Sequence, residues 1–372
     1  MKIINSNNDF TSDEHYNKES PLSQEPLYRY NVENCQINYI FEISDSKKYR
    51  RIKFKDCVFK EDVILKNISI SENLIFWNCK FEKCVTFHDV TIKRKARFWE
   101  TTFNELKIDN LRFEDLADFF KTKFKENTIF YKTDFLATTV FTASIFEKNL
   151  LFTYSKISDV LIFSRTKFLK GMDLSQAIIT GKIKNSNSDF PNFEKKMDID
   201  DDDNYRDSFE FNGQITLQNK RETFRILKKA AQDEGNQFKF LEYSKIENET
   251  YFEQLKPIWI KRFDNYIIFL LNKISNDHNM SWSRGILFTA IIGLLFFYTS
   301  LITTSLIEFG FDIELFSYYL GKYIFFLSPI HKIDLFEEEI ATTGTIILDF
   351  LGRLFVGYGI YQTIQAFRKH KG

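Results

Sequence analysis

The segment 54–87, FKDCVFKEDVILKNISISENLIFWNCKFEKCVTF, contains the pattern that decides the fold. Large apolar residues recur in it at alternating intervals of five and six residues, at Phe54, Phe59, Leu65, Ile70, Phe76, Phe81 and Phe87. The same rhythm extends from Val32 to Ile179. A helix needs a period of 3.6 and a plain strand a period of two, so neither explains it.

The rhythm sorts the large residues into four columns with a 22-residue period, and one residue is missing between Phe103 and Ile108, where all columns shift together. Four evenly spaced inward positions per period predict a solenoid whose coils have four short sides. A smaller residue lies two positions before each large one and would fill the remaining interior. The columns are Val32, Phe54, Phe76, Phe98, Phe119, Phe141, Phe163; Ile37, Phe59, Phe81, Phe103, Phe124, Phe146, Phe168; Ile43, Leu65, Phe87, Ile108, Phe130, Phe152, Leu174; and Ile70, Ile92, Phe113, Phe135, Ile157, Ile179.

Segments such as Cys57-Val58-Phe59 and Cys79-Lys80-Phe81 resemble the pentapeptide-repeat proteins, in which a small residue precedes a central Phe or Leu every five residues. The resemblance covers about residues 32–190. It implies a right-handed quadrilateral β-helix and says very little about biochemical function. The chain departs from the family pattern by adding one residue at every second corner.

Composition narrows the class of protein further. The chain has 372 residues, 51 Lys and Arg against 51 Asp and Glu, and therefore no net charge that would favour nucleic acid. Its 42 Phe residues suit a Phe-stacked solenoid combined with membrane helices. Cys35, Cys57 and Cys79 are 22 residues apart, so we expect them to stack in successive coils as buried, unpaired thiols.

The predicted fold class is mixed, with a β-helix of 22-residue coils followed by a helical hairpin and two transmembrane α-helices. The acidic run 198–203 suggests a calcium loop, but it lacks the Gly and Glu of an EF-hand, which favours a solvated loop. The predicted domains are a disordered N-terminal segment at 1–30, the β-helix at 31–190, an acidic loop or linker at 191–219, a helical hairpin cap at 220–257, an interfacial helix region at 258–282 and a membrane domain at 283–372.

Two spans are expected in the membrane domain, at about 286–307 and 342–366. Between them, Phe316–Leu327 is apolar but too short to cross, which indicates a re-entrant or interfacial helix ended by Pro329. Basic residues flank the two spans and acidic residues occupy the loop between them. The positive-inside rule therefore predicts a multi-pass protein of the inner (cytoplasmic) membrane with both termini in the cytoplasm.

The second span contains two features that suggest function. Asp349 and Arg353 are four residues apart and are expected to pair, either to fix helix packing, which is favoured, or to line a polar path. Val356-Gly357-Tyr358-Gly359 is similar to a potassium-channel filter, but no further span follows it. Gly357 and Gly359 are therefore interpreted as small residues that permit close helix packing.

We expect no enzyme, cofactor or metal site. The sequence has no phosphate loop, nucleophile elbow or clustered metal ligands, and the pair Asp277-His278 has no Ser or Cys nucleophile assigned beside it. The expected partners are the lipid membrane and a protein, with no nucleic acid and with a homo-oligomer allowed. The closing stretch from Gly357 to Lys369 resembles the ending of membrane pentapeptide-repeat proteins from the Bacteroidetes.

Three functions remain open. The first is a membrane protein with a cytoplasmic β-helical scaffold for protein binding. The second is a channel-like or channel-derived two-helix protein gated by its cytoplasmic domain, a plan that some membrane pentapeptide-repeat proteins resemble. The third is a DNA-mimicking gyrase protector of the kind that some soluble pentapeptide-repeat proteins resemble. It is the weakest, because the repeats carry many outward basic residues, among them Lys55, Lys60, Lys66, Lys80, Lys83, Lys93, Arg94, Lys95 and Arg97.

Overall fold

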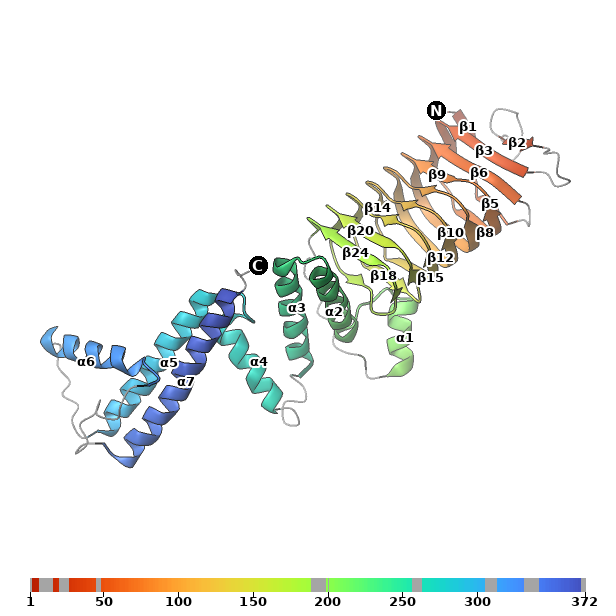
Figure 1. Cartoon of the computed structure of the whole chain (residues 1–372). Helices are drawn as coiled ribbons and strands as arrows, with labels where there is room; N and C mark the ends of the chain where they lie inside the picture. The colour runs from red at the N-terminus through yellow and green to blue at the C-terminus, as the bar shows by residue number, and fades with distance from the viewer. Residues whose placement is uncertain are drawn as a thin grey trace. The chain divides into compact units, whose positions relative to one another are not determined.

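The computed structural model describes residues 2–6, 16–19, 27–44, 48–188, 199, 201–255, 263–304, 313–330 and 341–368. The chain divides into two compact units, Met1–Ala230 and Ala231–Gly372, which are considered separately. The first unit holds all the described strands, stacked one coil upon the next, with α1 and most of α2 (Figure 1). The second unit is helical.

The described strands range from two residues in β7 to 13 in β10, and each element has the following bounds. The strands are β1 (Lys2–Ile4), β2 (Tyr16–Glu19), β3 (Leu27–Glu33), β4 (Cys35–Ile37), β5 (Phe41–Ile43), β6 (Lys48–Lys55), β7 (Val58–Phe59), β8 (Val63–Ile70), β9 (Leu74–Trp77), β10 (Lys80–Ile92), β11 (Ala96–Arg97), β12 (Thr102–Phe113), β13 (Ala117–Asp118), β14 (Lys123–Phe124), β15 (Thr128–Phe135), β16 (Thr139–Val140), β17 (Ile145–Phe146), β18 (Leu150–Thr153), β19 (Lys156–Ile157), β20 (Val160–Ser164), β21 (Lys167–Phe168), β22 (Met172–Asp173), β23 (Ile178–Ile179) and β24 (Lys182–Ser186). The helices are α1 (Asp202–Glu210), α2 (Leu217–Asp233), α3 (Gln237–Leu255), α4 (Phe263–Asn276), α5 (Trp282–Thr303), α6 (Ile313–Phe326) and α7 (Thr343–Arg368).

The strands form a parallel β-solenoid of about seven turns. Within the coils, strands pair in parallel with the equivalent strand one coil later, so that Phe59 lies beside Phe81 and Phe81 beside Phe103. Between β10 and β12 the register shifts between Phe81 and Cys84, and the pairs beyond this shift are one residue closer in sequence. This shift corresponds to the residue that the columns are missing after Phe103.

Stacked Phe rings fill the interior. In the first column, Val32 and the six Phe residues are 0 to 2% exposed, so none of them is available to a ligand. Adjacent rings lie nearly parallel, with centroids 4.8 Å apart for Phe98 and Phe119 and 4.7 Å apart for Phe119 and Phe141. The second column stacks in the same way, at 4.6 Å for Phe124 and Phe146. The predicted columns are therefore the core, with Ile179 of the last coil only partly covered.

The smaller inward residues have a second role that the sequence analysis did not assign. The Oγ1 of Thr101 donates a hydrogen bond to the carbonyl of Phe76 at 2.9 Å, and the Oγ of Ser144 donates to that of Phe119 at 2.6 Å. In earlier coils the Sγ of Cys79 takes this place, 3.5 Å from the carbonyl of Phe54. Cys35, Cys57 and Cys79 are buried and free, as predicted. The small inward residues represented by Cys79, Thr101 and Ser144 therefore form a column of hydrogen-bond donors that links successive coils.

The corners after the first and third columns depend on a left-handed residue. Among the described residues, positions with positive φ recur two places after the large residue, for example at Asp56, Asn67 and Asn78. Asn and Asp adopt this region more readily than other residues with a Cβ. Most later coils place other residue types there, while Asn110 and Asn187 keep Asn; the other types are Glu100, Lys121, Lys132, Ala143, Tyr154 and Arg165. The backbone at these positions is therefore more strained than at the positions occupied by Asn or Asp.

We expect the substitution Arg165→Asn to stabilise the solenoid by about 0.5–1 kcal/mol, because Asn lowers the cost of the left-handed corner. Arg165 has a φ of 52° and an exposed side chain. Thermal unfolding of the full chain measures the change. The matched control is Lys167→Asn in β21, an exposed position within a strand, which is expected to be neutral or slightly destabilising. Equal effects of the two changes would contradict the corner argument.

The N-terminal segment differs from the prediction of disorder over residues 1–30. Strand β1 pairs in parallel with β4, which places Ile4 beside Ile37 and buries it fully. Strand β2 pairs antiparallel with β3. The physical reason is that the first coil has an open edge of backbone donors and acceptors, and a short β-branched segment such as Ile3-Ile4 can satisfy it.

The other end of the solenoid is covered by α1 and α2. The fully buried carboxyl of Asp173 accepts hydrogen bonds from the backbone N of Ser175 at 2.7 Å, from Nδ2 of Asn219 at 2.8 Å and from Oγ1 of Thr223 at 3.3 Å. Burial raises the pKa of Asp173, although these hydrogen bonds oppose that effect. Helix α2, which holds Asn219 and Thr223, is thereby fixed to the last coil.

The predicted acidic loop at 191–219 contains a helix. Asp201 is the N-cap of α1 and accepts a hydrogen bond from the backbone N of Asn204, and Asp202 and Asp203 lie in the first turn. Acidic residues at these positions favour a helix N-terminus, which accounts for Asp201, Asp202 and Asp203. Asp198 and Asp200 lie outside the described residues. Of the predicted hairpin at 220–257, α2 contacts the last coil in the first unit, whereas α3 packs on α4 in the second through Phe252 and Tyr266.

Candidate functional site

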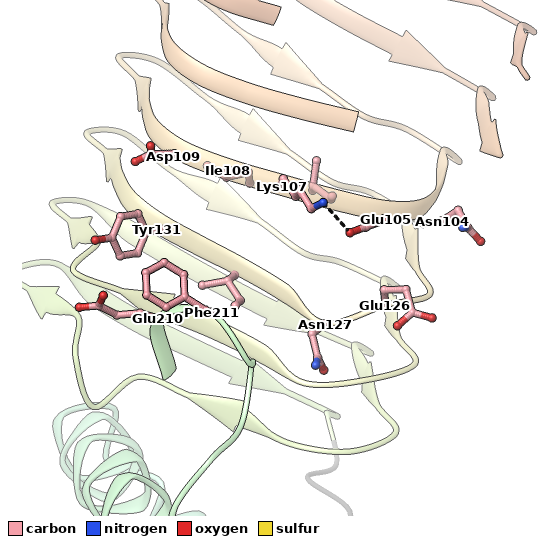
Figure 2. Close-up of a pocket in the computed structure, with 12 residues that line it drawn as sticks. Asn104, Glu105, Lys107, Ile108, Asp109, Glu126, Asn127, Tyr131, Glu210 and Phe211 are labelled. Carbon is pink, nitrogen blue, oxygen red and sulfur yellow. Dashed lines mark ion pairs between the residues drawn. The ribbon is translucent and has the colours of Figure 1, made fainter. Parts of the chain in front are cut away.

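A groove on the outer surface of the solenoid is the first candidate site (Figure 2). It has a volume of about 680 Å³. One wall is the outward side of β12 and β15, and the other is the end of α1. Its lining residues are Asn104, Glu105, Leu106, Lys107, Ile108, Asp109, Glu126, Asn127, Ile129, Tyr131, Glu210 and Phe211.

Hydrogen bonds hold the segment after α1 against the solenoid. The Nδ2 of Asn127 donates to the carbonyl of Asn212 at 3.2 Å, and the Nδ2 of Asn149 donates to that of Gly213 at 2.9 Å. Gly213 has a φ of 59°, and a Cβ there would lie 2.8 Å from the side chain of Asn127. Glycine is therefore required for this close approach.

Glu210 closes one end of the groove. Its Oε1 accepts hydrogen bonds from the hydroxyl of Tyr154 and from Nε of Arg206, both at 2.8 Å. Burial raises the pKa of the Glu210 carboxyl, but these hydrogen bonds, together with the positive charges of Arg206 and Lys132, lower the pKa overall. The adjacent Phe211 is 69% exposed and offers an apolar surface at the mouth.

Acidic groups in the groove already have basic partners. Glu105 pairs with Lys107 at 3.1 Å, and Asp109 lies 3.0 Å from Nδ1 of His88. Glu126 pairs with Lys148. Among the residues that the structure describes, no group of three or more His, Cys, Asp or Glu could hold a metal ion. The groove thus combines exposed aromatic surface with paired charges, a mixture suited to contact with another polypeptide.

The second unit contains two helices, α5 and α7, that are long and apolar enough to cross a membrane. They lie side by side (Figure 1) and meet through small residues. A Cβ on Gly359 would lie 2.3 Å from Oγ1 of Thr289, and one on Gly285 would lie 2.5 Å from Oγ1 of Thr363. At the far end of the pair, the hydroxyls of Thr303 and Thr345 are 2.8 Å apart.

The predicted polar pair lies on the packed face of α7. Nη2 of Arg353 is 2.6 Å from Oδ2 of Asp349, whose side chain is 5% exposed. Asp349 shares this face with the buried residues Gly352 and Val356. Of the two glycines predicted to permit close packing, Gly359 does so, whereas the nearest atom to a Cβ on Gly357 is 4.0 Å away on Pro329.

Helix α6 ends beside the middle of both long helices. The hydroxyl of Tyr323 donates to the carbonyl of Ala290 at 2.7 Å. A Cβ on Gly293 would lie 2.5 Å from Leu327, and one on Gly352 would lie 2.5 Å from the ring of Phe326. The predicted short helix between the spans is therefore present, and its C-terminal end reaches the centre of the pair.

A buried amide cluster joins α4 to α7, and the sequence analysis missed it. Nδ2 of Asn276 donates to the carbonyl of Gln362 at 3.0 Å. Oδ1 of Asn272 accepts from the hydroxyl of Tyr358 at 2.9 Å and from Nε2 of Gln362 at 3.0 Å. The sequence does carry a signal for this cluster. In α4 and again in α7, two polar residues lie four positions apart among apolar neighbours, which places them on one face of each helix. This cluster fixes the predicted interfacial helix to the second span; residues 258–262 of that region lie outside the described residues.

The turn between α4 and α5 is strained. Asp277, His278 and Asn279 all have positive φ, at 55°, 55° and 71°. Asp277 offsets this cost by accepting ion pairs from Lys245 at 2.7 Å and from Arg284 at 3.4 Å. His278 is 5% exposed, and its Nε2 has no hydrogen-bond partner. The pair Asp277-His278 is therefore a packed turn with no nucleophile at hydrogen-bond distance among the described residues.

Acidification is expected to destabilise this turn. Burial lowers the pKa of His278, and Lys273 and Lys245 lower it further, against the opposing effect of Asp277. The ordinary pKa of a histidine side chain is about 6.5. When the pH falls below this value, the unfolded chain binds the proton before the folded chain does. The free energy of unfolding therefore decreases by at most about 1.4 kcal/mol for each pH unit of acidification. Thermal unfolding at pH 8 and pH 5.5 measures this, and His278→Asn, which tolerates positive φ, should reduce the dependence. An unchanged pH dependence in that variant would contradict the assignment.

Comparison with known proteins identifies no relative. No family model, curated protein or solved structure matches the chain. The resemblance to pentapeptide-repeat proteins therefore rests on the repeat residues themselves.

Proposed function

We propose that this protein is a non-enzymatic, membrane-anchored scaffold whose β-solenoid binds a protein partner in the groove between β12, β15 and the end of α1. The observation that carries the proposal is the groove itself, with exposed Phe211 at its mouth. The solenoid interior is filled by aromatic rings, which leaves the outer surface for recognition. Helices α5 and α7 supply the anchor in the same chain.

The proposal includes a finer account of each part. The solenoid is a right-handed quadrilateral β-helix of the pentapeptide-repeat type with 22-residue coils, as the paired columns and the small-large alternation favour. The chain crosses the inner membrane twice, with both termini and the solenoid in the cytoplasm. Support comes from the basic residues near Arg284 and Arg368 at the same end of the helix pair, and from the free thiols.

A photo-crosslinking amino acid at Phe211 tests the groove. Ile178, in β23, is 62% exposed and serves as the matched position outside it. In intact cells we expect one reproducible protein adduct from position 211 and none of that mass from position 178. The adduct should weaken when Tyr131 is changed to Ser, which removes apolar surface from the groove. The same adducts from both positions would contradict a specific site.

A channel-like or channel-derived function is the second candidate, and the position of α6 favours it. The order of long helix, short helix and long helix, with the short one ending at mid-span, matches a two-helix channel plan. The chain between Leu327 and Ile330 contains no Gly, which argues against a potassium filter. Ion flux into liposomes tests this function. Flux that is absent, or unchanged by Asp349→Asn, would remove its support.

A further inference from the structure

The carboxyl group of Glu210 is hydrogen-bonded through only one of its two oxygens. Oε1 accepts from the hydroxyl of Tyr154 and from Nε of Arg206. Oε2 is buried and has no hydrogen-bond partner among the residues that the structure describes, and the residue as a whole is 3% exposed. Such an acceptor is rare in a folded protein, because it has lost water without gaining a donor from the protein.

The Glu210 carboxyl is also held in its charged form. Burial raises its pKa, but the hydrogen bonds from Arg206 and Tyr154 and the positive charges of Arg206 and Lys132 lower the pKa overall. The group is therefore ionised at neutral pH. A buried carboxylate oxygen without a donor is more costly than a neutral acceptor in the same place, so a donor brought by a ligand would stabilise the complex.

This carboxylate lies at the aromatic end of the groove. Figure 2 shows the side chain of Glu210 at the same end as Tyr131 and Phe211. The groups around it are exposed: the side chain of Arg206 is 64% exposed and Phe211 is 69% exposed. A partner can thus reach the carboxylate by displacing surface side chains, without opening the core of the solenoid.

The lining of the groove carries more acidic than basic side chains. Its carboxylates belong to Glu105, Asp109, Glu126 and Glu210, whereas its basic side chain is Lys107. The bases that pair with Asp109 and Glu126 lie outside the lining. The charge of the lining therefore complements a cationic group on the partner.

Lysine fits this end of the groove better than arginine. The planar fork of arginine is suited to a carboxylate that offers both oxygens, whereas lysine is a point charge. In Glu210, Oε1 already accepts two hydrogen bonds, which leaves Oε2 for a single donor. The apolar stem of a lysine can lie along the exposed ring of Phe211 while its ammonium group reaches the carboxylate.

We propose that the protein partner inserts a lysine side chain into the groove and that the ammonium group donates a hydrogen bond to Oε2 of Glu210. The proposal rests on the proposed function, which places a protein partner in this groove, and adds the chemical group that is recognised. A segment without a cation would leave the buried oxygen unpaired, and the groove would thereby discriminate against it.

The adduct from a photo-crosslinking amino acid at position 211 provides the first measurement. Glu210→Gln keeps an oxygen that accepts from Tyr154 and Arg206 but places an amide donor where the lysine would donate. We expect the adduct yield to fall about ten-fold or more, as for the loss of a hydrogen bond to a charged group. The matched control is Glu147→Gln, which removes a carboxylate that pairs with Lys123 outside the groove lining and should leave the yield within about two-fold.

An unchanged yield in Glu210→Gln would overturn the proposal, and this is also the result expected if a water molecule, rather than the partner, serves Oε2. Equal losses in the Glu210 and Glu147 variants would overturn it as well, since the effect would not be specific to the groove.

Modification of the partner's lysines provides an independent measurement. Membranes that contain the full chain with the crosslinking residue are mixed with a detergent extract of cells that lack the protein. Acetylation of the extract removes the lysine charge, whereas reductive methylation keeps it. We expect acetylation to abolish the adduct and methylation to retain it, and Glu210→Gln should reduce the adduct with the methylated extract as it does with the untreated one.

The outcomes separate the two proposals. An adduct that survives acetylation in full overturns the lysine contact and leaves the binding groove standing. The absence of any specific adduct with the untreated extract overturns the proposed function and the lysine contact with it.

Discussion

Replacing Phe119 by alanine is expected to destabilise the solenoid by about 3–5 kcal/mol, the range for deleting a large buried aromatic side chain. Phe119 is 2% exposed. Its ring stacks on Phe98 at 4.8 Å and on Phe141 at 4.7 Å, and meets Phe130 edge-on at 5.9 Å. The cavity would open in the middle of the stack, where each coil contacts only its two neighbours. Urea unfolding followed by circular dichroism measures the loss.

The adjacent Phe120 is the matched control. Its side chain points outward, with the Nζ of Lys121 5.2 Å from its ring centroid. Phe120→Ala should cost less than about 1 kcal/mol, since a partly exposed ring loses little buried area. Phe119→Leu should cost about 1.5 kcal/mol or less, because it preserves most of the volume. If the two alanine variants were equally stable, the stacked column would not be the core.

Replacing Gly359 by leucine is expected to separate α5 from α7. A Cβ at this position would lie 2.3 Å from Oγ1 and 3.1 Å from Cβ of Thr289, so the helices must move apart before any larger side chain fits. Helix association in lipid depends on close packing of this kind. We expect the loss of the 2.8 Å contact between Thr303 and Thr345. Disulfide formation between cysteines placed at these two positions reports it, and should fall at least five-fold.

Gly357 supplies the control two residues earlier in the same helix. The nearest atom to a Cβ there is Pro329 at 4.0 Å, an ordinary contact. Gly357→Leu should therefore leave the disulfide yield within about two-fold. The two changes have the same chemistry and differ only in which side of α7 they occupy. A larger effect at position 357 would mean that α7 presents a different face to α5.

The sequence by itself determined the solenoid and its core. The inward residues repeat with the same period as the strand pairing. A one-residue error in register would turn every side chain to the opposite face, so the positions of the large residues predict the register of the strands. The sequence also predicted helix within 220–257, where α3 (Gln237–Leu255) begins two residues after Gly235, which adopts a φ of 70°. The sequence likewise predicted two apolar segments that are long enough to cross a membrane.

Only the tertiary structure decided the candidate sites, because their contacts join residues that no local pattern connects. The groove depends on Asn127 and Asn212, 85 residues apart, and the amide cluster on Asn276 and Gln362, 86 apart. The pairing of Ile4 with Ile37 also joins residues that are distant in sequence, and so does the contact of the end of α6 with the middle of α5 and α7. Periodicity reports which face of an element is buried, whereas these contacts depend on which elements meet, and that is decided by packing in three dimensions.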